Sequence, residues 1–230
     1  MKKLIRLHYH YLFNRTSLFI LLAVLFLSFL GFLESALSFK DDISGFADFY
    51  YFESSFFLLK LIGIFISVFT FAYSLLPKAD QYAELVLVAE VSRTVYFCSK
   101  VLVIFLYLIF FLLLEFSLYL LCGVCFLKRF SSPSFPAFLK LLLLTLDYGL
   151  LSLALMQILR NLYVIAIPLM LFITGSIINE KSGFFPYYFN LVIPNFLSEK
   201  PELYHGTVHV LMMIIILLLL NLLLYLARDL

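Results

Sequence analysis

The chain has 230 residues, of which 64% are hydrophobic and 13% are charged, with 28 Phe, 15 Tyr and no Trp. A soluble domain is closer to half apolar and a quarter charged, so this composition excludes an ordinary soluble protein and indicates a lipid environment. The net charge of +2, with no basic patch beyond the charges that flank apolar segments, argues against a nucleic-acid partner.

The first 16 residues predict an amphipathic helix that lies in the membrane interface. Cationic and polar residues recur there at helical spacing, and apolar residues lie largely on another side. The polar set is Lys3, Arg6, His10 and Asn14, and the apolar set is Leu4, Leu7, Tyr11 and Leu12. The apolar run from Ser17 is longer than a signal-peptide core and no small-residue cleavage site follows it, so we interpret it as a retained first span.

Six apolar segments are each close to the roughly 20 residues that cross a bilayer. They predict an all-α polytopic membrane protein, in one transmembrane domain, with spans at residues 17–39, 55–76, 101–127, 137–159, 162–178 and 207–227. Only Arg160 and Asn161 separate the fourth segment from the fifth. We interpret this as a tight hairpin; a single broken helix, giving five spans in all, is the alternative.

The distribution of charge predicts the orientation. The N-terminal segment is basic, whereas the loop after the first span holds four acidic residues and only Lys40 as a cation. By the positive-inside rule, both termini face the cytoplasm, although Lys128 and Arg129 then fall outside. On the outer side, residues 179–206 include GFFPYYFNLVIPNFL, which is apolar but too short and Pro-broken to span. A partly re-entrant segment and an aromatic segment lying flat at the interface both fit it.

Residues 77–98 predict a cytoplasmic amphipathic helix between the second and third spans. Pro77 suits a helix start, and Glu84 favours the positive end of the helix dipole. Leu85, Val88 and Val91 form an apolar face opposite a charged one. Such a helix can rest on the membrane or fit a groove on a partner.

The stretch from Glu84 to Arg93, followed by Lys100, resembles a segment of type-2 ABC export permeases. In that family a Glu opens the segment, a Pro-Val-Ser-Arg-like turn comes nine residues later, and a Lys starts the third span. Here Gln81-Tyr82 replaces the family's Gly-Thr, and Glu90 replaces its Pro. The order of an interfacial helix, six spans, a helix between spans two and three and an outer re-entrant segment also resembles the family, over nearly the whole chain.

The resemblance implies that residues 77–98 form a coupling helix gripped by an ABC ATPase, with Glu84, Leu85, Val88, Arg93 and Lys100 as coupling residues. The chain has no G-x-x-x-x-G-K-[ST] motif, so it is not expected to be an enzyme or to bind a cofactor directly. ATP and Mg would reside in two copies of the partner ATPase, beside a second permease copy or a related permease. The implied function is export of a hydrophobic or amphipathic cargo, such as a peptide, a bacteriocin or a drug, across the cytoplasmic (inner) membrane of a bacterium.

Three ionisable residues fall within predicted spans: Lys60, Glu115 and Asp147. Because charges in the membrane are costly, they either line a polar pathway or pair with one another and stabilise helix packing. Gln157 and Asn221 are expected to form interhelical hydrogen bonds.

Two other classes of function remain open. A structural or assembly subunit would use the same packing without a pathway. A membrane-embedded enzyme needs paired catalytic groups at one depth, and the four histidines lie toward the two ends of the chain, which leaves no catalytic candidate. His205 and His209 lack a suitable acid for a metal site, and Cys122 and Cys125 are interpreted as small packing residues.

Overall fold

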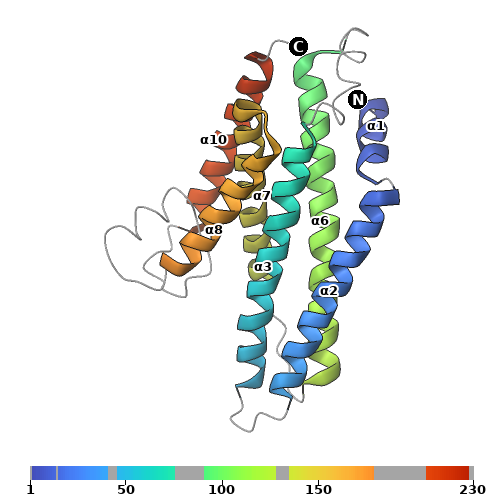
Figure 1. The fold of residues 1–230 in the computed structure, drawn as a ribbon, viewed down its shortest axis with the longest axis vertical. Coiled ribbons are helices and arrows are strands. Elements are labelled where there is room, and N and C mark those ends of the chain that lie inside the picture. Colours follow the sequence, from blue (N-terminus) through green and yellow to red (C-terminus); the bar gives the residue numbers. More distant parts are fainter. Residues whose placement is uncertain are drawn as a thin grey trace.

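The computed structural model describes residues 2–13, 15–40, 46–75, 91–127, 135–178 and 206–227, and every regular element in these ranges is helical. The helices are α1 (Lys2–Leu12), α2 (Arg15–Phe39), α3 (Ala47–Tyr73), α6 (Arg93–Phe126), α7 (Phe135–Leu159), the 3₁₀ helix η1 (Leu162–Ile165), α8 (Ala166–Ile178) and α10 (Gly206–Ala227) (Figure 1). Helices suit this composition because each satisfies its own backbone hydrogen bonds, as a hydrocarbon environment requires.

Five of these helices are long and apolar enough to cross a membrane: α2, α3, α6, α7 and α10. For the described residues, this finding confirms the prediction of an all-helical fold with several helices that could span a membrane. The sixth predicted span, residues 162–178, consists of η1 and the 13-residue α8. At 1.5 Å per residue α8 is about 20 Å long, less than the roughly 30 Å of a hydrocarbon core, so a sixth span stays a prediction.

From α2 onward the helices run alternately up and down, and α1 runs in the same direction as α2 (Figure 1). The start of α1, the end of α3, the start of α6 and the end of α10 share one end of the bundle, here called the terminal end. Between α7 and η1 the chain reverses at Arg160, which has a φ of 49°, and α8 then packs back against α3 and α7. Residues 137–159 and 162–178 are therefore separate segments joined by a tight turn, as the hairpin interpretation predicts.

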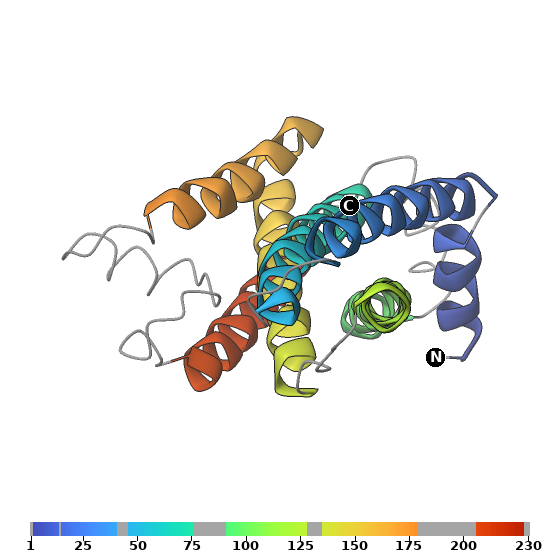
Figure 2. The same cartoon turned by 90° about the horizontal axis from the view of Figure 1, so that it is seen from below.

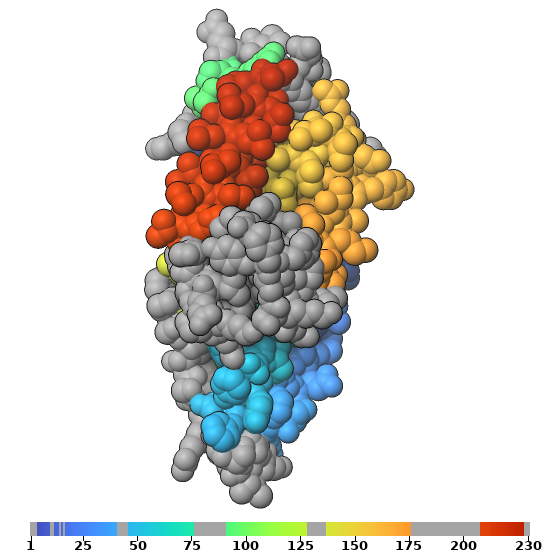
Figure 3. Space-filling view, turned by 90° about the vertical axis from the view of Figure 1, so that its left-hand side faces the viewer, coloured from blue at the N-terminus to red at the C-terminus, as the bar shows by residue number. Residues whose placement is uncertain are grey.

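The central helix of the bundle is α7. All ten residues from Leu141 to Leu150 are buried, which requires neighbours on every side of the helix. The most extensive contacts of α7 are with α3 and α10. Figure 2 shows α1 and α8 on opposite sides of the bundle, and Figure 3 shows α10 beside α7 on one face.

Small residues allow α3 and α7 to approach closely along a line that we call the α3–α7 seam (Gly63, Ser67, Thr145, Gly149 and Ser152). The hydroxyl of Ser67 donates to the carbonyl of Thr145 at 2.6 Å, and that of Ser152 donates to the carbonyl of Val68 at 2.7 Å. A Cβ atom added at Gly149 would collide with Ser67 and with the ring of Phe71. Close backbone approach and hydroxyl-to-carbonyl bonds are the interactions that hold helices together in lipid.

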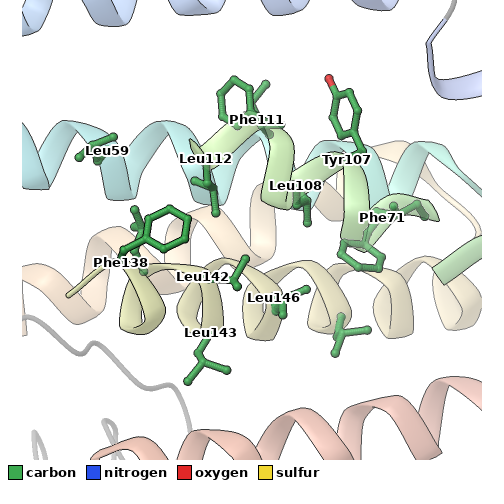
Figure 4. Packing of buried hydrophobic residues seen from close by; sticks show 14 of the residues in the cluster. Leu59, Phe71, Tyr107, Leu108, Phe111, Leu112, Phe138, Leu142, Leu143 and Leu146 are labelled. Carbon is green, nitrogen blue, oxygen red and sulfur yellow. The ribbon is translucent and has the colours of Figure 1, made fainter. Parts of the chain in front are cut away.

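An apolar core fills the space between α3, α6 and α7. Leu108 and Leu112 of α6 point toward Leu142 and Leu146 of α7, and all four are buried (Figure 4). The ring of Phe71 from α3 joins the same cluster and is fully buried.

Two helix starts lie about two turns before the predicted ones. The coupling helix was predicted to end at residue 98 and the third span to begin at 101, but residues 93–126 form the single helix α6. Its start is set by Ser92, whose hydroxyl accepts the N–H of Val95. The second span was predicted to begin at residue 55, but α3 already begins at Ala47, with Asp48 in its first turn. An acidic residue there stabilises a helix start, although it interrupts an apolar run.

Two predicted elements lie wholly or largely outside the described residues: the coupling helix up to residue 90 and the outer segment over residues 179–205. The amphipathic helix at the N-terminus is α1, and its inner face differs from the predicted one. Leu4, His8 and Leu12, spaced four residues apart, are buried, and α1 packs on α6. Leu7 and Tyr9 are exposed.

Candidate functional site

Glu115 lies near the middle of α6 with only 1% of its surface exposed. The hydroxyl of Ser28 on α2 donates a hydrogen bond to Glu115 Oε1 at 2.7 Å. Among the described residues, no hydrogen-bond partner lies within reach of Glu115 Oε2. A carboxyl group that is half satisfied inside an apolar bundle is costly, so its retention needs a reason beyond the packing of α2 on α6.

Lys60 and Asp147 are buried on two other helices, α3 and α7. The ammonium of Lys60 lies 5.9 Å from the centre of the Phe57 ring. Asp147 Oδ1 has no hydrogen-bond partner among the described residues. No ion pair within 4 Å joins Lys60 to either acid in the described part of the chain. Mutual neutralisation, one of the two sequence-based interpretations, is therefore not seen in this conformation.

The geometry of α3 explains why Lys60 and Glu115 do not meet. Helices α2 and α3 are antiparallel, with Gly31 next to Leu58, so Lys60 lies at nearly the same depth as Ser28 and its partner Glu115. Leu58 faces α2, and Lys60, two residues later, is rotated by about 200° around the helix. Lys60 thus points away from the α2–α6 contact that holds Glu115.

The polar clamp between α7 and α10 consists of Gln157 and Asn221. The amide of Gln157 donates to Asn221 Oδ1 at 2.8 Å, and the amide of Asn221 donates to the carbonyl of Leu150 at 3.0 Å. Both bonds cross from one helix to the other, and Asn221 is fully buried. The predicted interhelical hydrogen bonds of these two residues are confirmed.

The first two turns of α6 contain the predicted coupling residues Arg93 and Lys100. The guanidinium of Arg93 donates to the carbonyl of Leu226 in the last turn of α10, at 3.4 Å. Lys100 is buried, and its ammonium lies 5.4 Å from the centre of the Tyr96 ring. A cation near a helix C-terminus and a cation over an aromatic face are both favourable arrangements. Glu84, Leu85 and Val88, the other predicted coupling residues, lie outside the described residues.

The described residues do not gather into a candidate metal site. No group of three His, Cys, Asp or Glu side chains gathers in the described ranges. Cys122 is buried, whereas Cys98 and Cys125 are exposed, and all three are free thiols. His209 lies on α10, and His205 lies outside the described residues.

Several interacting residues were missed in the sequence analysis. Ser28 and the seam residues are small and sit in apolar segments, where a hydroxyl or a glycine every fourth residue signals close helix contact. Tyr51 was also missed; its hydroxyl donates to the carbonyl of Tyr119 at 2.7 Å, and the two rings stack with centres 5.0 Å apart. Small residues at four-residue spacing could have indicated the seam, but no sequence feature indicates the tyrosine pair.

No family model, curated protein or solved structure matches the chain.

Proposed function

We propose that the chain is the permease subunit of an ATP-driven exporter of the type-2 ABC class. The observation that carries this proposal is the position of α6. It starts at Ser92-Arg93, where the predicted coupling motif ends, and its start lies at the terminal end with the start of α1 and the end of α10. The end of α3, which precedes the coupling segment, lies there too. An ATPase at this end would reach the coupling segment from the same side as both chain-terminal helices.

The mechanism that follows is mechanical. An ATPase pair that closes on ATP and Mg moves the coupling segment, and α6 moves with it because the two are contiguous. A second permease copy, or a related permease, forms the other half of the pathway. The spans of the two permeases then switch between an inward-facing and an outward-facing packing. The cytoplasmic position of the terminal end follows from the basic N-terminus by the positive-inside rule. The expected cargo is hydrophobic or amphipathic, for example a peptide or a drug.

The buried charges favour a moving pathway over a static bundle. Glu115 and Asp147 each keep a carboxylate oxygen without a partner in the described residues. A subunit with only a structural role gains nothing from two such groups, because apolar residues of the same size pack at lower cost. The proposal therefore places Lys60, Glu115 and Asp147 where groups exchange partners as the helices shift.

The first experiment is a pull-down of the tagged chain from membranes in a mild detergent. We expect an ATPase with a phosphate-binding loop in a one-to-one ratio with the chain. Recovery of the chain with other membrane proteins and no ATPase would favour the structural-subunit alternative.

The second experiment addresses the coupling residues in vesicles that contain the complex. We expect Glu84→Ala and Arg93→Ala to leave the chain inserted but to separate ATP hydrolysis from transport. Glu53→Ala and Lys40→Ala remove the same charges from exposed positions at the opposite end of the bundle, and serve as matched controls. Normal transport by both coupling variants would show that residues 77–98 are not the contact with the motor.

A further inference from the structure

The terminal end contains an aromatic contact between α6 and α10, made by rings that belong to the buried core. The ring of Tyr225 on α10 lies against two rings of α6: Tyr96 at 6.3 Å between centres and 14° between planes, and Phe97 at 5.2 Å. Arg93 binds the carbonyl of the next residue, Leu226. We call these five residues the α6–α10 joint.

Tyr96 also connects the joint to α1. The ring of His8 meets it edge-on at 5.0 Å, and Lys100 lies over it. Tyr96 and Tyr225 are each only 1% exposed. Since buried rings in van der Waals contact cannot pass through one another, a displacement of the start of α6 must move its neighbours or break the contacts.

One helical turn before Tyr225, α10 carries Asn221, which binds Gln157 and Leu150 of α7. Residues four apart lie on the same face of a helix, so one face of α10 contacts α6 through Tyr225 and α7 through Asn221. A continuous set of contacts thus leads from the start of α6 to the central helix of the bundle. In chain order, α6 is also the first described helix that follows the coupling segment.

We propose that Tyr225 is a positioning residue that transmits movement of the coupling segment from α6 to α10 and, through Asn221, to α7. This inference rests on the proposed function for the origin of the movement. The contacts themselves are a property of the chain alone, so they can be tested without a motor protein.

The first test needs no ATPase. Amide hydrogen exchange of the purified chain in lipid nanodiscs is compared between the wild type, Tyr96→Leu and the control Leu223→Ala, whose side chain is largely exposed on α10. We expect Tyr96→Leu to raise exchange about tenfold in the last turn of α10 and in the part of α7 that holds Leu150 and Gln157. Faster exchange confined to α6 and α1 would overturn the proposal.

The second test measures cargo transported per ATP hydrolysed. Tyr225→Phe keeps the ring and is expected to match the wild type, whereas Tyr225→Leu is expected to hydrolyse ATP while its transport falls several-fold. If Tyr225 had a purely structural role, Tyr225→Leu would lower ATP hydrolysis and transport together, and the cargo transported per ATP would stay unchanged. That result would overturn transmission through Tyr225. If the wild-type chain recruits no ATPase, the proposed function fails, and the exchange experiment still decides whether the joint connects α6 to α7.

Discussion

The α3–α7 seam leads to a quantitative prediction for Gly149→Ala. Alanine is the better helix former by about 0.5–1 kcal/mol, so on propensity alone this change should stabilise the chain. The new methyl group, however, would overlap Ser67 and the ring of Phe71. Phe71 is fully buried, and the Ser67 hydroxyl is held by its bond to the Thr145 carbonyl, so neither can move aside freely.

Overpacking of this kind costs about 1–3 kcal/mol. After subtracting the gain in helix propensity, which leaves roughly 0–2.5 kcal/mol, we expect Gly149→Ala to lower the free energy of unfolding by about 1 kcal/mol. Gly31→Ala is the matched control. Its methyl group would meet only the end of the Leu58 side chain, 2.5 Å from Cδ2 and 3.9 Å from Cγ, which can rotate away. This variant is expected to be as stable as the wild type or slightly more stable.

The free energy of unfolding of both variants and the wild type is measured in mixed micelles. The fraction of SDS is increased, and reversible unfolding is followed by far-UV circular dichroism. The expected order of stability is Gly31→Ala at or above the wild type and Gly149→Ala clearly below it. If Gly149→Ala proved as stable as Gly31→Ala, α3 and α7 would not approach as closely as the seam requires, and the reasoning would be refuted.

Four further predictions concern individual side chains. Ser28→Ala removes the 2.7 Å hydrogen bond to the Glu115 carboxyl and should lower stability in the same unfolding assay by about 1–3 kcal/mol, whereas Ser28→Thr keeps the hydroxyl and should not. Asn221→Leu should cost about 1–2 kcal/mol, because it breaks bonds to two helix-α7 residues in a membrane bundle; an unchanged unfolding midpoint would contradict the clamp. Tyr51→Phe should cost about 1 kcal/mol through loss of the bond to the Tyr119 carbonyl, with the ring stack retained. N-Ethylmaleimide should label Cys98 and Cys125, near the two ends of α6, but label Cys122 only after denaturation, and mass spectrometry of the intact chain would count the adducts.

The helices themselves were predictable from the sequence because hydropathy and length suffice to define a membrane helix. The predicted spans 137–159 and 207–227 differ from α7 and α10 by only two residues and one residue at their starts. The start of α6 was not predicted, since it depends on the cap formed by Ser92 and not on apolarity. Hydropathy therefore marks the part of a helix that lies in lipid, whereas polar caps determine where the helix begins.

The candidate site was less predictable than the helices. The sequence correctly predicted that Gln157 and Asn221 bind across a helix contact, because buried amides in lipid need partners. It also identified Lys60 and Glu115 as buried charges, but not that they face different sides of the bundle. Depth in the membrane follows from position along the chain, whereas the direction of a side chain around its helix depends on which neighbours the helix packs against.

The contacts in the described residues divide the bundle into a tightly held part and a more easily moved part. Between α3 and α7, glycines and short hydroxyl-to-carbonyl bonds bring the backbones together, and a shift there would break several bonds at once. At the terminal end, α6 contacts α10 through aromatic rings and one 3.4 Å hydrogen bond, so fewer hydrogen bonds resist a movement of α6 together with α10. In the proposed transporter, a displacement of the start of α6 would therefore tilt α6 and α10 together and reach the α3–α7 pair through the bonds of Asn221. Because Glu115 is on α6 and Lys60 is on α3, that same tilt would change the separation between the two buried charges.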